Sequence, residues 1–238
     1  MFRKGPKHKV VRVPEFKDVV YGNDRWALLR KLREVAAEVM KVLVQCGYSP
    51  IVHGSVARGD VDQNSDVDVV IPYTVAPAVV EACLDRGNLR IYRKTLVRAT
   101  PKSALKVVYE LTPNGDVTIS FPLERFSPRE LEFYKFGGSI SYEDLAKDIR
   151  KPGVTKSLIL IIPTEGGHRE APVVGYEYYV AKLLGVSIDT VRERVEILRR
   201  RDEVGRTGLF FKVVLDPSVS VEEVVREVTK KAGQRDRT

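Results

Sequence analysis

Two aspartates separated by one residue stand in the segment Ser65-Asp66-Val67-Asp68-Val69-Val70-Ile71. The alternation with valine predicts a strand, in which side chains two positions apart project from one face, about 6.6 Å apart along the chain. Two carboxylates on a buried face repel each other and raise each other's pKa unless a cation joins them. A hard divalent cation, Mg²⁺ or Mn²⁺, prefers such oxygen ligands. We therefore predict a metal site at Asp66 and Asp68.

A Gly-Ser pair, Gly54-Ser55, precedes this metal site by eleven residues and follows a short predicted strand, Ile51-Val52. Glycine lets a backbone approach a phosphate closely, and the start of the following helix offers free amide donors. The Ser55 hydroxyl adds one more donor. The turn therefore predicts a phosphate site, and a bound triphosphate would supply further ligands to the metal.

A third carboxylate on an adjacent strand would permit two metal ions. One ion would activate an attacking hydroxyl, and the other would neutralise a leaving pyrophosphate. Asp116, which opens the segment Asp116-Val117-Thr118-Ile119-Ser120, is the candidate. Two alternatives stay open: Asp116 is a turn residue after Asn114-Gly115, or Glu110 on the partner strand takes its place.

A run of basic residues lies between the second and third carboxylates, without an acid between Arg86 and Tyr109. Phosphoryl transfer depends mainly on positioning and charge neutralisation, so a triphosphate or an acceptor backbone is a suitable partner for such a run. We select Lys102 as the predicted ligand, although a solvated strand face accounts for any one of these residues equally well.

Two motifs, Gly54-Ser55-Val56-Ala57-Arg58-Gly59 and Ser65-Asp66-Val67-Asp68, together with the later Asp116, resemble the nucleotidyltransferase superfamily typified by DNA polymerase beta. The closer likeness is to the minimal nucleotidyltransferases, and it covers roughly residues 23–122. The resemblance implies transfer of a nucleoside monophosphate from an NTP, with two bound metal ions. It implies catalytic and metal-binding roles for Asp66, Asp68 and Asp116. The predicted nucleotide-binding residues are Gly54, Ser55, Arg58, Ser65 and Lys102. The structural alternative is a domain that keeps the fold without the activity.

The elements that must position these residues follow from hydrophobic periodicity. A helix is predicted from Asn23 or Asp24 to Gly47, because apolar residues recur at helical spacing between them. A second helix is predicted over residues 75–84. Residues 104–111 and 117–121 predict two strands joined by a hairpin turn at Asn114-Gly115. This order favours an α+β fold with a mixed sheet, as the resemblance also implies.

The last third of the chain predicts two helices across a short turn at Gly185. A strand over residues 209–215 follows in the position of a wing, so the segment resembles the winged helix-turn-helix of transcription regulators. Outward-facing residues of the second helix and the wing then predict nucleic-acid contacts. These residues are Thr190, Arg192, Arg199, Arg200 and Arg206. A winged helix that binds protein is the alternative.

Composition sets the remaining expectations. The net charge is +8, and its excess lies mainly in residues 1–53, which suits a polyanionic partner or a solvated leader. The chain contains no apolar run of membrane-spanning length, and we expect a cytoplasmic protein. Cys46 and Cys83 are expected as core thiols. The predicted division is a basic arm (1–22), a nucleotidyltransferase domain (23–135), a connecting module (136–170), a winged helix-turn-helix (171–216) and a C-terminal helix and tail (217–238).

The leading functional prediction is a metal-dependent nucleotidyltransferase with a nucleic-acid-binding C-terminal module. Its substrate is an NTP, and its expected acceptor is nucleic acid, with a protein acceptor left open. One alternative is a DNA-binding regulator whose first domain senses a nucleotide. Another is an enzyme that nucleotidylates protein, as in the antitoxins that resemble the minimal enzymes. The base and the oligomeric state are left open.

Overall fold

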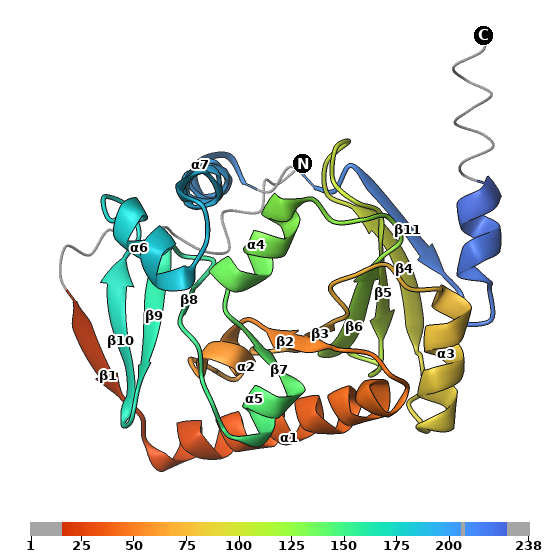
Figure 1. Ribbon diagram of the computed structural model, residues 1–238, viewed down its shortest axis with the longest axis horizontal. Helices are drawn as coiled ribbons and strands as arrows, with labels where there is room; N and C mark the ends of the chain where they lie inside the picture. The colour runs from red at the N-terminus through yellow and green to blue at the C-terminus, as the bar shows by residue number, and fades with distance from the viewer. Residues whose placement is uncertain (1–15, 206–207, 228–238) are drawn as a thin grey trace, which may run out of the picture.

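The computed structural model describes residues 16–205 and 208–227. Within these residues the chain forms a seven-stranded and a four-stranded β-sheet, and helices pack on both (Figure 1). No helix in the described part of the chain is long and apolar enough to cross a membrane. The predicted α+β architecture is confirmed.

The larger sheet has the strand order β11-β4-β5-β6-β3-β2-β7. β3 and β6 pair in parallel, and the other neighbours are antiparallel, so the predicted mixed sheet is confirmed. β5 and β6 form the predicted hairpin. The strands are β2 (Ile51–His53), β3 (Val67–Val70), β4 (Arg93–Arg98), β5 (Lys106–Glu110), β6 (Val117–Pro122), β7 (Ser139–Ser141) and β11 (Phe211–Leu215).

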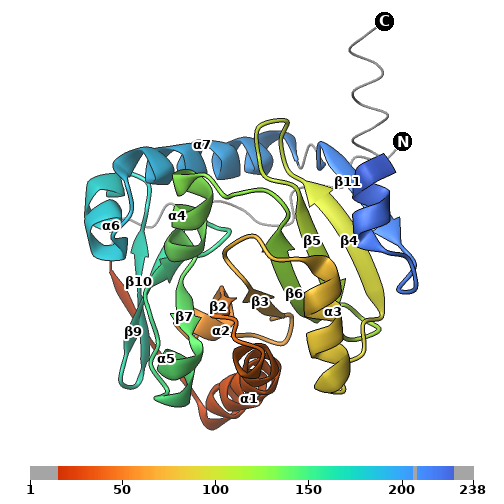
Figure 2. The same cartoon turned by 45° about the vertical axis from the view of Figure 1, so that its right-hand side comes forward.

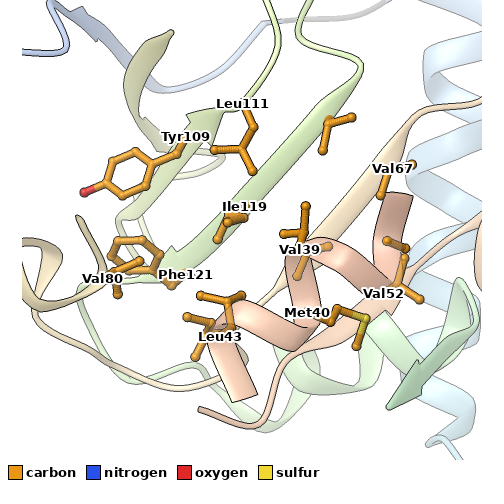
Figure 3. Packing of buried hydrophobic residues seen from close by; sticks show 14 of the residues in the cluster. Val39, Met40, Leu43, Val52, Val67, Val80, Tyr109, Leu111, Ile119 and Phe121 are labelled. Atoms are coloured by element: carbon orange, nitrogen blue, oxygen red, sulfur yellow. The ribbon is translucent and has the colours of Figure 1, made fainter. Parts of the chain in front are cut away.

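One face of this sheet carries the main hydrophobic core. Helices α1 (Asn23–Gln45) and α3 (Pro77–Arg86) contribute to this core. Figure 3 shows Val39 and Leu43 of α1 beside Val67 and Ile119 of the sheet, and all four side chains are buried. Because strand side chains alternate between faces, the residues next to Val67 and Ile119 project away from this core. They project toward the candidate site.

The smaller sheet has the order β1-β10-β9-β8, and all its pairs are antiparallel. Its strands are β1 (Lys17–Val20), β8 (Gly153–Val154), β9 (Ile159–Thr164) and β10 (Gly167–Pro172). Helices α6 (Glu177–Leu184) and α7 (Ile188–Val204) pack on it through a second core that includes Leu160, Val180 and Val195. The short helices α2 (Ser55–Arg58), α4 (Pro128–Phe136) and α5 (Tyr142–Ala146) lie between the two sheets (Figure 1).

Two strand pairings cross the predicted domain boundaries. β1 comes from the expected basic arm, yet it pairs with β10 of the expected connecting module. β7 comes from that same module, yet it pairs with β2 in the larger sheet. These pairings join segments that are far apart in sequence, and backbone pairing over such separations leaves no local pattern to read. α1 begins at Asn23, one of its two predicted starts, and its N-cap residue Gly22 offers no side chain to cap the helix.

The predicted helix-turn-helix is present, but the predicted wing is wrong. α6 ends at Gly185, whose φ of 61° is in the left-handed region, and α7 starts after Ser187. β11, the expected wing strand, instead pairs antiparallel with β4 at the edge of the larger sheet. Figure 2 shows α7 running from α6 across α4 toward the larger sheet. α7 therefore links the two sheets, and the helix-turn-helix carries no wing within the described residues.

The expectation that both cysteines are core thiols is also wrong. Cys46, directly after α1, and Cys83 of α3 form a disulfide with a Cα–Cα distance of 6.2 Å. α1 and α3 pack against each other over the larger sheet, and this packing brings the two residues together. Their separation of 37 residues in the sequence carries no such signal. The bond ties the end of α1 to the middle of α3.

Candidate active site

A cleft of about 1670 Å³ lies on the face of the larger sheet that points away from α1. The opposite wall comes from α4, the turn between β8 and β9, and α7. Six of the predicted site residues line this cleft, namely Gly54, Ser55, Arg58, Ser65, Asp66 and Asp68. The tertiary structure therefore brings both predicted motifs to one cavity.

Asp68 occupies the centre of this cleft floor. Val67 and Val69 point into the main core, so Asp68 faces the cleft, between His53 of β2 and Thr118 of β6 in the strand register. The Thr118 hydroxyl donates a hydrogen bond to Asp68 Oδ1 at 2.8 Å. Burial raises the pKa of Asp68, and the neighbouring Asp66 raises it further. A cation bound between the two carboxylates would relieve both effects.

The third predicted carboxylate, Asp116, does not line the cleft. Its side chain is exposed and accepts a hydrogen bond from the Thr112 hydroxyl. Its backbone oxygen accepts from the Val67 amide at 2.8 Å, which places Asp116 beside the start of β3. The rival Glu110 also lies outside the cleft lining, and it pairs with Arg93 at 3.1 Å.

The cleft-facing positions of β6 are instead taken by hydroxyl side chains, Thr118 and Ser120. In the part of the chain that the structure describes, no three His, Cys, Asp or Glu residues are grouped to hold a metal ion. The structure therefore brings Asp66 and Asp68 together in one cavity and leaves Asp116 at its edge.

The Gly-Ser turn connects β2 to α2. Gly54 has a φ of 87°, a left-handed conformation that favours glycine, and its amide donates to the Gly138 carbonyl at 2.9 Å. The Ser55 hydroxyl contacts the Ser65 hydroxyl at 3.2 Å. Both serines, which come from separate motifs, thus present their hydroxyls at one place beside Asp66.

Arg58 lies at the cleft, but its guanidinium is held by protein groups. It donates to both carboxylate oxygens of Asp60, each at 2.9 Å, and to the Gly137 carbonyl at 2.5 Å. The Asp60 side chain is only 9% exposed in this pair. The bonding indicates that Arg58 fixes the loop between the two motifs, and its binding of a nucleotide stays a prediction.

The structure also reveals cleft cations that the sequence did not single out. Lys102 is exposed in a turn outside the cleft, whereas Lys106, four residues later on β5, faces into it. Burial lowers the pKa of Lys106, and the charges of Glu130 and Asp68 act in the opposite direction. Strand alternation in Lys106-Val107-Val108-Tyr109 is the signal that would have identified it. Lys156, Arg194 and Arg201 also line the cleft, and only the tertiary structure brings them there.

The predicted nucleic-acid contacts divide into three groups. Thr190 is 3% exposed, and it is hydrogen-bonded to Ser187 and Glu132, so its predicted outward position is wrong. It helps to hold the start of α7 against α4. Arg192, Arg199 and Arg200 are exposed, as predicted. Arg206 lies outside the described residues.

A family model described as a nucleotidyltransferase domain matches residues 31–96. The matched segment includes the Gly54-Ser55 turn and the Asp66–Asp68 pair, and it ends before Asp116. No curated protein matches the chain. The match supports membership of the nucleotidyltransferase superfamily, and the mixed sheet is consistent with it. The match also suggests transfer of a nucleoside monophosphate from a nucleoside triphosphate.

Proposed function

We propose that the chain is a metal-dependent nucleotidyltransferase that moves a nucleoside monophosphate from an NTP to an acceptor. The observation that carries the proposal is the pair Asp66 and Asp68, which face the same cleft as the Gly54-Ser55 turn. Asp68 is a desolvated carboxylate, and in the described residues it forms no ion pair. Such a group favours a bound cation.

Asp66 and Asp68 would hold Mg²⁺ or Mn²⁺, as two ions, which polarise the phosphates and lower the pKa of the acceptor hydroxyl. The Thr118 hydroxyl orients the Asp68 carboxylate. Ser55 and Ser65 would donate to the phosphate oxygens. Lys106 of β5 adds positive charge to the cleft, and this charge would stabilise a leaving pyrophosphate.

Asp116 is proposed as the third metal ligand. Its position beside the start of β3 puts its backbone next to that of Asp66 and Val67. To reach a metal ion, its side chain would have to exchange the hydrogen bond from Thr112 for the ion. Thr112 thus binds this carboxylate when no metal ion is present.

A second candidate is a nucleotide-sensing domain of a DNA-binding regulator. Thr118, which lies opposite Asp68, carries a hydroxyl and not a third carboxylate, and this favours the second candidate. A site with two carboxylates can bind a nucleotide and its metal without transferring the nucleotide. The exposed Arg192, Arg199 and Arg200 on α7 would then contact DNA phosphates.

Incubation with α-labelled NTPs and Mg²⁺ distinguishes these functions. We expect label to transfer to RNA, DNA or protein, and we expect Asp66→Asn and Asp68→Asn to reduce transfer at least 100-fold. Asp24→Asn, an exposed change in α1, is the matched control. Label on protein would identify the nucleotidylating enzyme. NTP binding without transfer would support the regulator, and undiminished transfer by Asp68→Asn would refute the site.

A further inference from the structure

The cleft contains unsatisfied polar atoms that the nucleotide site does not use. In the described residues, three buried side-chain atoms lack a hydrogen-bond partner: His53 Nε2, Arg194 Nε and Asp202 Oδ1. All three residues line the cleft. Buried polar atoms without partners are costly. Arg194 is the only positively charged residue of the three, so it is the one that suits an anionic ligand.

Arg194 is the central residue of this group. It lies on the side of α7 that faces the cleft, and its guanidinium lies 4.8 Å from the centre of the Phe133 ring. Burial lowers its pKa to about 10, and the nearby charge of Arg201 adds to that effect. It forms no ion pair with an acidic side chain within the described residues. These features suit Arg194 for binding an anion.

A second cation, Lys156, comes from the turn between β8 and β9. Its charge and that of Arg194 both lower the pKa of His53, so the two cations act on the same part of the cleft. Apolar side chains also line this wall, and most of them belong to the second core. These apolar side chains are Phe136, Val154, Ile159 and Leu198.

The cleft is also larger than one nucleotide requires. Its volume of about 1670 Å³ exceeds the range of roughly 300–1,000 Å³ typical of a site for one small ligand. With an NTP at Ser55 and Asp68, room remains beneath α7 for an acceptor. The exposed face of α7 carries Arg192, Arg199 and Arg200, whereas Arg194 faces the cleft. A strand bound in the cleft would therefore contact Arg194, and a duplex on the outer face would contact the other three arginines.

We propose that this remaining space binds a single-stranded nucleic-acid end as the acceptor, and that Arg194 and Lys156 hold its backbone phosphates. The proposal rests on the nucleotidyltransferase function above. In the reaction, the terminal hydroxyl oxygen forms a bond to the α-phosphorus of the NTP. The bond from that phosphorus to the pyrophosphate oxygen breaks, pyrophosphate leaves with its electron pair, and the hydroxyl proton passes to solvent. α7 thus contributes to the active site with its inner face.

Binding of a fluorescein-labelled five-nucleotide RNA or DNA strand, followed by fluorescence anisotropy, tests this proposal without turnover. We expect Arg194→Gln and Lys156→Gln each to weaken binding about tenfold and to reduce the salt slope by about 0.7 per lost phosphate contact. Arg192→Gln, on the exposed side of the same helix, is the matched control, and it should change affinity less than twofold. Arg194→Lys, which keeps the charge, should restore part of the affinity.

The outcomes separate this proposal from the proposed function. Asp68→Asn should abolish transfer but still bind the strand, so a failure of catalysis leaves the binding test readable. Loss of binding in Arg192→Gln or Arg200→Gln, with Arg194→Gln unaffected, would overturn the proposal, as would tighter binding of a duplex. If AMP binds in a way that depends on Arg194 and the strand does not bind at all, the two cations belong to a site for a free nucleotide. That result would overturn the proposal of a bound strand.

Discussion

Asp68 of β3 and Thr118 of β6 face each other in the parallel strand pair, and the Thr118 hydroxyl donates to Asp68 Oδ1 at 2.8 Å. A hydroxyl thus occupies the position of β6 that lies directly opposite Asp68. Asp116, two residues earlier, lies at the edge of the cleft with Thr112 as its partner. The strand face around Asp68 therefore carries two carboxylates, Asp66 and Asp68, and the hydroxyl of Thr118.

We predict that Thr118→Asp binds Mn²⁺ about tenfold more tightly than the wild type, because an additional carboxylate raises the charge of the ligand set. Thr118→Val removes the hydroxyl without adding charge, and it should not increase the affinity. Electron paramagnetic resonance of free Mn²⁺ measures both. Equal affinities in Thr118→Asp and Thr118→Val would show that this position does not reach the metal.

We predict that Lys106→Gln weakens binding of an NTP analogue with Mg²⁺ about tenfold, because a charge-assisted contact to phosphate is lost in a buried place. Lys102→Gln is the matched control, since Lys102 is exposed in a turn outside the cleft. Isothermal titration calorimetry measures both affinities. A larger effect of Lys102→Gln would show that Lys102, the residue predicted from the sequence, binds the nucleotide.

We predict that His53 makes the protein sensitive to mild acid. Burial, with the charges of Arg58, Lys106, Lys156 and Arg194, lowers the pKa of His53 to about 3. Below pH 6.5 the unfolded chain binds a proton at His53, whereas the folded chain does not. The free energy of unfolding therefore decreases as the pH is lowered. Between pH 6.5 and 5 the loss is about 2 kcal/mol in metal-free buffer.

Urea denaturation at pH 7.5 and pH 5 measures the effect of His53. His53→Gln removes the titrating group, so its free energy of unfolding should fall about 2 kcal/mol less than that of the wild type over this range. If both proteins lose the same stability, the imidazole is protonated in the folded state, contrary to its buried position.

We predict that reduction of the Cys46–Cys83 disulfide lowers the free energy of unfolding by about 3–4 kcal/mol, because the bond closes a loop of 37 residues in the unfolded chain. Denaturant unfolding with and without dithiothreitol measures the change. Cys46→Ser, at the half-buried partner, should unfold equally in both conditions. An unchanged wild type under reductant would argue that the two thiols are not joined.

Local patterns predicted the parts of the site that lie close together in sequence. The alternation of Asp66 and Asp68 with valines identified both carboxylates, because a strand must send alternate side chains to opposite faces. The turn at Gly54-Ser55 could be predicted because it needs a left-handed φ, which glycine adopts readily. The hairpin of β5 and β6 followed from its turn residues.

Local sequence patterns therefore specify the two motifs on the floor of the site and indicate the class of domain that carries them. The tertiary structure decided the rest: that Lys156 and Arg194 reach the cleft, that Asp116 lies at its edge, and that β11 joins the larger sheet instead of forming a wing. The physical reason is separation along the chain. Periodicity fixes which face a side chain takes within its own element, whereas the packing of distant elements decides what that face meets.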